Sequence, residues 1–227
     1  MTATRRTAAL VGALFLVTHV TSVGARILYT PVVTDPTRLG DDTPLLVGAL
    51  LEVVLAVAVA ATAFVVHPAV TRHNPGAALG YVALRTLEAS VILAGVVAIL
   101  TLASIRTALA ADGVDHTGLE TLAGVVTSFQ DWTFVIGPGL VCGVNTVLLA
   151  WIMFRSGLVP RFIGMLGIVG GPVVFLVNAL KVLDLDEPLM PWLGLGAVPV
   201  FAWEILLALY LLFRGFRPTA PDAPLRG

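Results

Sequence analysis

The sequence predicts an all-α protein, a polytopic transmembrane bundle of six helices. Hydrophobic residues make up 58% of its 227 residues and charged residues only 12%, whereas soluble domains carry about 25% charged residues. The apolar residues also fall into six runs, each long enough for the roughly 20-residue helix that crosses a bilayer. The mean hydropathy of +0.98 agrees with this class.

The six predicted spans follow one another through short connections and form one domain, residues 1–217. They are expected at residues 7–29, 44–66, 77–105, 132–154, 162–183 and 192–213. The Pro-rich last residues, 218–227, predict a short disordered cytoplasmic tail. The first run, with Arg5 and Arg6 before it, could also be read as a secretory signal peptide. It stays apolar as far as Tyr29, which favours a retained span.

The segment before the fourth span, residues 114–130, has two interpretations. It is too polar at its start to cross a membrane, but Leu119, Leu122, Val126 and Phe129 recur at helical spacing. One interpretation is a helix that lies on the outer membrane face before the fourth span. In the other, the fourth span begins earlier and bends at Pro138, because proline interrupts the helical hydrogen-bond ladder.

Most arginines fall on one side of the predicted spans, and the positive-inside rule then places both termini in the cytoplasm. The arginines on that side are Arg5, Arg6, Arg72, Arg155, Arg161, Arg214, Arg217 and Arg226. Arg38 and Arg106 are expected in loops on the opposite side, where most acidic residues also fall.

Aromatic residues near the predicted span ends indicate a belt at the two membrane–water interfaces. Trp132, Trp192 and Tyr29 are expected at the outer interface, and Tyr81, Trp151 and Tyr210 at the inner one.

Pairs of glycines four residues apart occur in three places, and small residues let helix backbones approach closely in lipid. The pairs are Gly76 with Gly80, Gly139 with Gly143, and Gly167 with Gly171. We expect these faces to pack helices inside the bundle; the alternative is that one of them joins two copies in a homodimer.

Three glutamates, Glu52, Glu88 and Glu204, lie inside predicted spans. A carboxylate in hydrocarbon is costly, so such residues usually face a bundle interior or a water-filled cavity. Arg85 lies one helical turn before Glu88, a spacing at which the two side chains meet on one face. Two roles are open for this pair: a structural ion pair or a part of a site. We therefore expect the functional region, if the chain has one, around these glutamates.

Further polar residues fall at comparable depths and extend the candidate site. His19 shares a helix face with Ser22 and Arg26, because the offsets are three and four residues. The depths predict a polar pocket that opens to the outer face and has Arg85, Glu88 and Glu204 at its floor. The candidate ligand or proton site comprises Glu52, Arg85, Glu88, Glu204, His19, Asn145, Asp131 and Asn178.

Simpler roles remain open for several of these residues. Asp131 can cap its helix near water, and His19 can be a satisfied histidine of the bundle interior. Arg26 and Lys181 can extend to the outer headgroups while their aliphatic stems stay in the membrane. Cys142 reads as a small buried packing residue.

Several classes of function are disfavoured by composition and motifs. The net charge of −1 offers no basic surface for nucleic acid, and a single cysteine allows no intrachain disulfide. The four histidines lack metal-ligand spacing, and no phosphate loop or nucleophile elbow occurs. We expect no metal and no cofactor. The expected partners are the lipid bilayer, a small-molecule or lipid ligand, and a second copy of the chain.

Three stretches resemble the bacterial membrane-protein family catalogued as domain of unknown function 4386. They are Leu-Arg-Thr-Leu-Glu-Ala at residues 84–89, Phe-Arg-Ser-Gly-Leu-Val-Pro-Arg-Phe at 154–162 with the glycines that follow, and Ala-Trp-Glu-Ile-Leu at 202–206 with the Phe-Arg-Gly-Phe at 213–216. The resemblance covers about residues 5–216 and is most specific between Arg155 and Arg161. It implies a multi-pass protein of the bacterial inner membrane, and it implies no activity, substrate or catalytic residue.

Three functional classes stay open at this point. Buried carboxylates suit a small proton-coupled transporter, and they also suit a membrane-embedded enzyme that protonates or hydrolyses a lipid or isoprenoid. The third class is a structural, sensory or partner-binding membrane protein. Substrate-dependent flux would identify the transporter, and turnover of a lipid would identify the enzyme.

Overall fold

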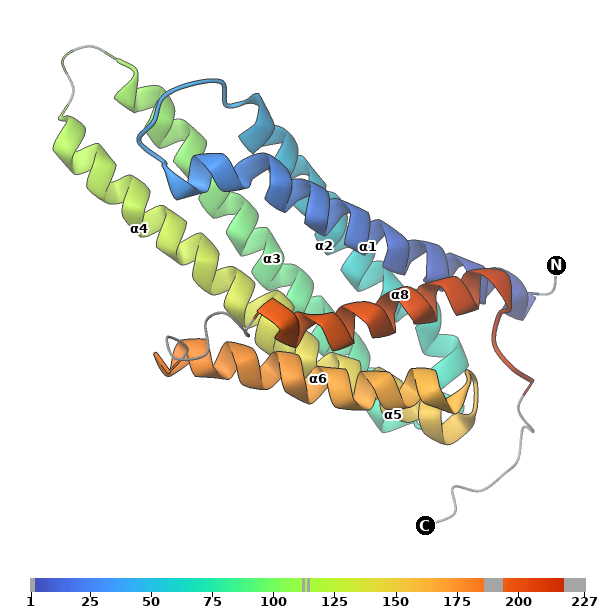
Figure 1. Cartoon of the computed structure of the whole chain (residues 1–227). Helices are drawn as coiled ribbons and strands as arrows, with labels where there is room; N and C mark the ends of the chain where they lie inside the picture. Colours follow the sequence, from blue (N-terminus) through green and yellow to red (C-terminus); the bar gives the residue numbers. More distant parts are fainter. Residues whose placement is uncertain (1–2, 112, 114, 186–193, 219–227) are drawn as a thin grey trace.

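The computed structural model describes residues 3–111, 113, 115–185 and 194–218, and its regular elements there are all helical. The elements are α1 (Ala3–Thr34), α2 (Thr43–Val70), α3 (Pro75–Leu109), α4 (His116–Phe134), the π-helical η1 (Val135–Val141), α5 (Cys142–Ser156), α6 (Arg161–Val182), the 3₁₀ turn η3 (Gly194–Ala197) and α8 (Val198–Phe213). Six helical stretches are long and apolar enough to cross a membrane. This confirms the predicted six-span bundle (Figure 1).

The fourth span is longer than expected. α4, η1 and α5 form one uninterrupted helix of 41 residues, His116–Ser156, and α4 packs along α3 over its length (Figure 1). The structure therefore follows the second interpretation, in which the span begins before residue 132, and the prediction of a separate interfacial helix was wrong. The helix continues past Pro138 because η1 widens locally to a π-helix, which accommodates the missing backbone N–H.

Local sequence explains where the helices begin and end. The Asn74 side chain accepts a hydrogen bond from the Ala77 N–H at 3.0 Å, and Pro75 takes the first helical position of α3. Asp115 caps α4 through the Gly118 N–H. α5 ends at Ser156, and the Gly157 that follows has a φ of +72°, the left-handed conformation that glycine adopts without strain.

The six spans form a closed ring around a central space. α1 packs on α2, α2 on α3, α3 on α5, α5 on α6, α6 on α8, and α8 on α1. The four helices α1–α4 extend past α6 and α8 at the end that lies away from the N-terminus (Figure 1). The 35 residues of α3 span about 52 Å at 1.5 Å per residue, more than the roughly 30 Å hydrocarbon core of a bilayer.

Arg106 holds the far end of this extension together, and its predicted place in a loop was wrong. It lies in the last turn of α3, only 3% exposed. Its Nε donates to Asp42 Oδ1 at 2.6 Å, and its Nη1 donates to the carbonyls of Pro36 and Arg38 at 2.9 and 2.8 Å. One buried guanidinium therefore fixes the connection between α1 and α2.

The start of α1 and the end of α8 lie side by side (Figure 1). The Arg5 guanidinium donates to the carbonyls of Leu211, Leu212 and Phe213 at 3.2, 2.9 and 2.7 Å. These carbonyls belong to the last turn of α8, where the helical hydrogen-bond ladder ends, so Arg5 caps that helix from another part of the chain. The Leu211 carbonyl also accepts from the Gly215 N–H at 3.1 Å. An even number of spans brings both ends of the bundle to one side. Their cytoplasmic location stays a prediction.

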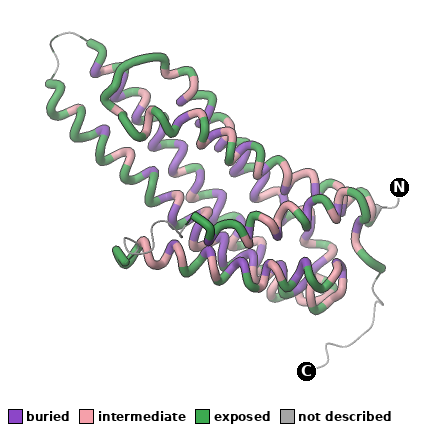
Figure 2. The backbone as a smooth tube through the Cα atoms, in the orientation of Figure 1, coloured by how far each residue is buried: buried purple, intermediate pink, exposed green. Residues whose placement is uncertain are grey.

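Buried residues line the inner faces of the helices (Figure 2). A Cβ atom on Gly143 or Gly171 would collide with the opposing helix backbone, so this pair brings α5 and α6 into close contact. A Cβ atom on Gly139 would meet the Asn178 side chain, and one on Gly167 would meet Ala150 and Trp203, all within the same bundle. Two of the three glycine faces therefore pack the bundle, as expected. A homodimer through the third stays a prediction.

The predicted aromatic belt was partly wrong. Trp132 and Trp151 are 48% and 44% exposed, as an interfacial position requires. Tyr29 and Tyr81 are only 1% exposed, because their rings fill the core between helices. Trp192, the acidic residues 186–187 and the tail 219–227 lie outside the described residues.

Candidate functional site

A cavity of about 270 Å³ occupies the centre of the helix ring. It extends from Lys181 and Gly194, near the adjoining ends of α6 and η3, to Arg85 and Glu88 on α3. Most of its wall is apolar, with side chains that include Leu55, Val59, Ile92, Val174, Val200 and Phe201. The ionisable side chains His19, Arg85, Glu88 and Glu204 also line it.

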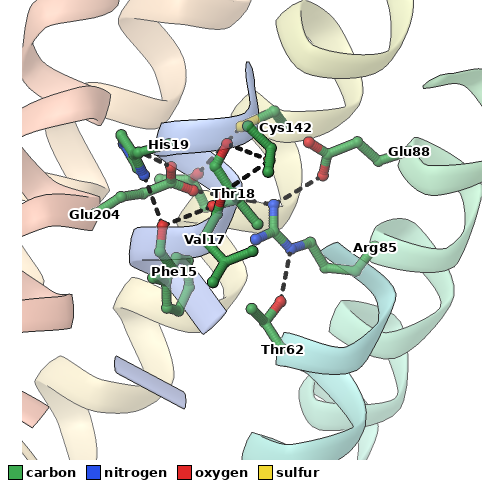
Figure 3. A network of polar contacts seen from close by, with 11 residues as sticks. Phe15, Val17, Thr18, His19, Thr62, Arg85, Glu88, Cys142 and Glu204 are labelled. Carbon is green, nitrogen blue, oxygen red and sulfur yellow. Dashed lines mark hydrogen bonds and ion pairs between the residues drawn. The ribbon is translucent and has the colours of Figure 1, made fainter. Parts of the chain in front are cut away.

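Arg85 and Glu88 form the most buried part of this wall. Arg85 Nη1 lies 3.0 Å from Glu88 Oε2, and Asn145 Nδ2 donates to the same oxygen at 2.7 Å. The Arg85 Nε points the other way and donates to Thr62 Oγ1 at 3.3 Å (Figure 3). The sequence predicted the Arg85–Glu88 pair, whereas Asn145 comes from a separate helix and joins it only in the folded bundle.

The Arg85 guanidinium lies among aromatic rings as well as polar groups. Its Cζ is 5.4 Å from the Phe15 ring centroid and 6.0 Å from that of Tyr81, within the range of cation–π attraction. Its Nη2 has no hydrogen-bond partner within the described residues. The guanidinium therefore keeps an N–H group that no side chain or carbonyl of the described residues accepts.

Glu204 reaches the same arginine from α8, but at longer distances. Its Oε1 lies 3.9 Å from Arg85 Nη1, and its Oε2 lies 3.5 Å from His19 Nε2. Both distances exceed the roughly 3.2 Å limit of an ordinary N–H···O hydrogen bond. The Glu204 side chain is 14% exposed, against 5% for Glu88. Glu204 is therefore the more accessible carboxylate of the cavity.

His19 is held in one orientation. Its Nδ1 lies 2.8 Å from the Phe15 carbonyl, which can only accept, so Nδ1 carries a proton and donates (Figure 3). Its ring packs edge-on against Phe201 at 4.4 Å between centroids. Nε2 is then the nitrogen that faces Glu204, and a proton on Nε2 makes the two an ion pair.

Glu52 does not join this network. Tyr29 Oη donates to Glu52 Oε1 at 2.6 Å, and Gln130 Nε2 donates to Tyr29 Oη at 3.3 Å. Glu52 lines a separate small cavity of about 10 Å³ beside the central one. Glu88 and Glu204 therefore line the same cavity, whereas Glu52 lies apart from it and bonds to Tyr29.

The remaining candidates divide between the cavity and the surface. Asn178 lines the cavity, and its Nδ2 donates to the Val174 carbonyl of its own helix at 2.8 Å. Asp131 is exposed on α4 and lies outside the residues that line the cavity. It lies in the middle of a longer helix than expected, so it caps no helix start.

Ser22, Cys142 and Lys181 also line the cavity, although sequence reasoning did not select them. The spacing of His19 and Ser22 on one helix face was the available signal for Ser22. The sequence suggested that Lys181 contacts lipid headgroups and that Cys142 packs between helices. The sequence of one helix does not show which other helices surround a cavity with it. Among the described residues, no group of three or more histidines, cysteines and carboxylates could hold a metal ion.

The family described as "Domain of unknown function (DUF4386)" matches residues 10–215. No curated protein and no solved structure matches the chain. The matched region contains all six spans in large part and every charged group of the cavity wall. This multi-pass membrane protein therefore belongs to the family described as "Domain of unknown function (DUF4386)".

Proposed function

We propose that the protein binds a small amphipathic molecule in the central cavity, with a hydroxyl or amine group of the ligand donating to Glu204. One observation carries the proposal: an accessible carboxylate projects from α8 into an apolar cavity of about 270 Å³ in the centre of the bundle.

The apolar wall indicates the body of the ligand. Leu55, Ile92 and Val174 come from three different helices and surround the cavity with aliphatic groups. Ligand sites commonly measure about 300–1,000 Å³, so this volume suits a small molecule rather than a whole membrane lipid. An alkyl or isoprenoid chain of modest length fits both the size and the apolar surface.

Glu204 indicates the polar end. The Glu204 carboxylate accepts no hydrogen bond of ordinary length within the described residues, since its two contacts are at 3.5 and 3.9 Å. Glu88 accepts two, from Arg85 and Asn145. A ligand hydroxyl or ammonium would meet the remaining hydrogen-bonding capacity of Glu204, as buried polar groups generally require.

The ligand would enter from the side of the membrane opposite the termini. Lys181 and Gly194 line the end of the cavity on that side. With both termini in the cytoplasm of a bacterial cell, as the arginine distribution predicts, this is the outer side of the inner membrane.

The test compares octylamine, octanol and octanoate on the purified protein in detergent, with thermal unfolding as the readout. Octylamine and octanol are expected to raise the unfolding temperature, and octanoate to raise it less, because its carboxylate would face Glu204. The Glu204→Gln variant should lose most of the octylamine effect, whereas the surface variant Asp131→Asn should keep it. Equal stabilisation by all three compounds in both variants would contradict the proposal.

Proton-coupled transport is the second candidate, and it has its own observation. The π-helical η1 borders the cavity through Pro138 and Gly139, and π-helical bulges are frequent at functional sites. His19 and Glu204 both line this cavity with 3.5 Å between Nε2 and Oε2, close enough to exchange a proton. Octylamine-dependent proton movement into liposomes that contain the protein, absent with Glu204→Gln, would distinguish transport from binding alone.

A further inference from the structure

Glu52 belongs to a second polar cluster that the proposed ligand site does not use. Glu52, Tyr29 and Gln130 come from α2, α1 and α4, and they are 6%, 1% and 3% exposed. Glu52 and Gln130 line a cavity of about 10 Å³, which Ser22 and Thr133 also line. Four of the side chains around this small space therefore carry oxygen atoms that can hydrogen-bond.

The hydrogen bonds of the cluster fix the direction of each group. Tyr29 Oη gives its only proton to Glu52 Oε1 at 2.6 Å, so it can receive a hydrogen bond only from an N–H or O–H donor. Gln130 Nε2 supplies this donor at 3.3 Å. The orientation of the Gln130 amide follows, and it leaves Gln130 Oε1 without a donor among the described residues.

An acceptor as buried as Gln130 Oε1 is normally paired with protein or with an ordered water. A polar cavity holds a water once it reaches about 10–15 Å³ and offers two to four polar partners. The cavity beside Glu52 has this size and these partners. A water there would donate to Gln130 Oε1 and bond to the Glu52 carboxyl at the same time.

We propose that this small cavity binds one water molecule between Glu52 and Gln130, and that the Glu52 carboxyl exchanges its proton with the central cavity through it. The two cavities share Ser22, Leu55, Ile92, Phe134 and Pro138 in their walls, so they lie side by side. Ser22 carries a hydroxyl on this shared wall and completes the hydrogen-bonded path.

The proton transfer needs no further reactant. Protonated Glu52 gives its proton to the bound water, which passes one of its own protons to solvent in the central cavity. The carboxylate that remains keeps the hydrogen bond from Tyr29. The reverse sequence returns the proton, so atoms and charge balance in both directions.

Few ionisable groups surround Glu52, and none of them is among His19, Arg85, Glu88 and Glu204, which line the central cavity. On α1, Tyr29 contacts Glu52, and Arg26 places its Cζ 5.8 Å from the Tyr29 ring centroid and 4.3 Å from that of Phe134. α3 contributes Ile92 to the small cavity, α4 contributes the uncharged Gln130, Thr133 and Phe134, and η1 contributes Pro138. Glu88 of α3 lines the central cavity only.

The first test is an experimental density map of the full chain in a lipid nanodisc, at a resolution that shows ordered water. We expect one solvent peak about 2.6–3.2 Å from both Gln130 Oε1 and a Glu52 oxygen. No peak there, or a Gln130 amide oxygen bonded to a protein donor, would overturn the proposal. This test needs no variant, so it decides the question even if substitutions prevent folding.

The second test follows protonated carboxyl groups by infrared spectroscopy in membranes transferred to heavy water. We expect a carboxylic-acid band that Glu52→Gln removes and Glu204→Gln retains. Its hydrogen–deuterium exchange should slow at least tenfold in Gln130→Leu, which takes away one partner of the water. An acid band unaffected by Glu52→Gln, or the same exchange rate in Gln130→Leu, would contradict the proposal.

These results are separable from those of the ligand site. Octylamine binding depends on Glu204, whereas the water and the Glu52 band depend on Gln130 and Glu52. Loss of octylamine stabilisation in Gln130→Leu would indicate that the substitution disturbs the whole bundle. For that reason, the hydrogen–deuterium exchange rate of the Glu52 band in Gln130→Leu is compared with that of the native chain only after this variant has been shown to bind octylamine.

Discussion

Glu88 and Glu204 contact the same guanidinium and yet differ in almost every other respect. Glu88 lies 3.0 Å from Arg85 and accepts a second hydrogen bond from Asn145, with its side chain 5% exposed. Glu204 lies 3.9 Å from Arg85 and 3.5 Å from His19, with its side chain 14% exposed. One carboxylate is satisfied by the protein, and the other keeps capacity for a ligand.

The contrast separates two uses of buried charge. A hydrogen-bonded intramembrane ion pair fixes how helices pack, and here it connects α3 with α5 through Asn145 and with α2 through Thr62. A carboxylate held loosely at a cavity wall adds little to packing, but it can bind. A charge inside a membrane helix is therefore informative only together with its partners.

The largest expected effect comes from removing the shared cation. Arg85→Leu leaves Glu88 buried without its charge partner, and breaking a buried pair in this way typically costs about 3–5 kcal/mol. Unfolding of the purified protein by increasing dodecyl sulfate in mixed micelles measures this loss. The double variant Arg85→Leu/Glu88→Leu should recover part of it, since no unpaired Glu88 remains. An Arg85→Leu variant as stable as the native chain would remove the structural half of the comparison.

Asn145→Leu should have the next largest effect on stability. It deletes a hydrogen bond to a charged group, a loss of about 1.5–3 kcal/mol. The same unfolding assay applies, and octylamine binding should persist because Asn145 contacts Glu88 rather than Glu204. If Asn145→Leu instead abolished binding and left stability unchanged, the roles of the two carboxylates would have to be exchanged.

Glu204→Gln should show the opposite pattern. We expect a change in stability of no more than about 1 kcal/mol, because the loosely held carboxylate contributes little. Octylamine affinity should fall about tenfold or more, which corresponds to about 1.4 kcal/mol of binding free energy. Isothermal titration in detergent measures the affinity directly. A stability loss as large as that of Asn145→Leu would show that Glu204 is structural.

The smallest effect is expected at Asp131, which serves as the matched control. It carries a carboxyl group, as the glutamates do, but is exposed on α4 and does not line the cavity. Asp131→Asn should change stability by less than about 0.5 kcal/mol, as surface substitutions usually do. Its octylamine affinity should equal that of the native chain, and a loss at this position would mean that the assay reports membrane charge rather than the cavity.

Sequence periodicity was enough to predict six spans, the Arg85–Glu88 pair and the inward direction of Glu204. These depend on the length of apolar runs and on spacing within one helix. Sequence alone did not show that Tyr29 would donate a hydrogen bond to Glu52, nor that Arg106 would pair with Asp42. Such contacts join residues far apart in the chain, and helical spacing shows which face is buried without showing which helix covers it.

The start of the fourth span escaped prediction for a different reason. Residues 116–134 are only moderately apolar, because α4 covers α3 in the part of the bundle that extends beyond α6 and α8. A helix that leaves the hydrocarbon core needs fewer apolar residues, so composition alone suggested a surface helix.

The most direct test of the account compares the accessibility of positions 88 and 204. Glu88→Cys and Glu204→Cys are each introduced into a Cys142→Ser background, which removes the only native thiol. The variants are reconstituted in liposomes and treated with a positively charged, membrane-impermeant thiol reagent. We expect rapid labelling at position 204 and little at position 88. Equal labelling of both, or of neither, would contradict the claim that Glu204 alone is the open carboxylate of a ligand cavity.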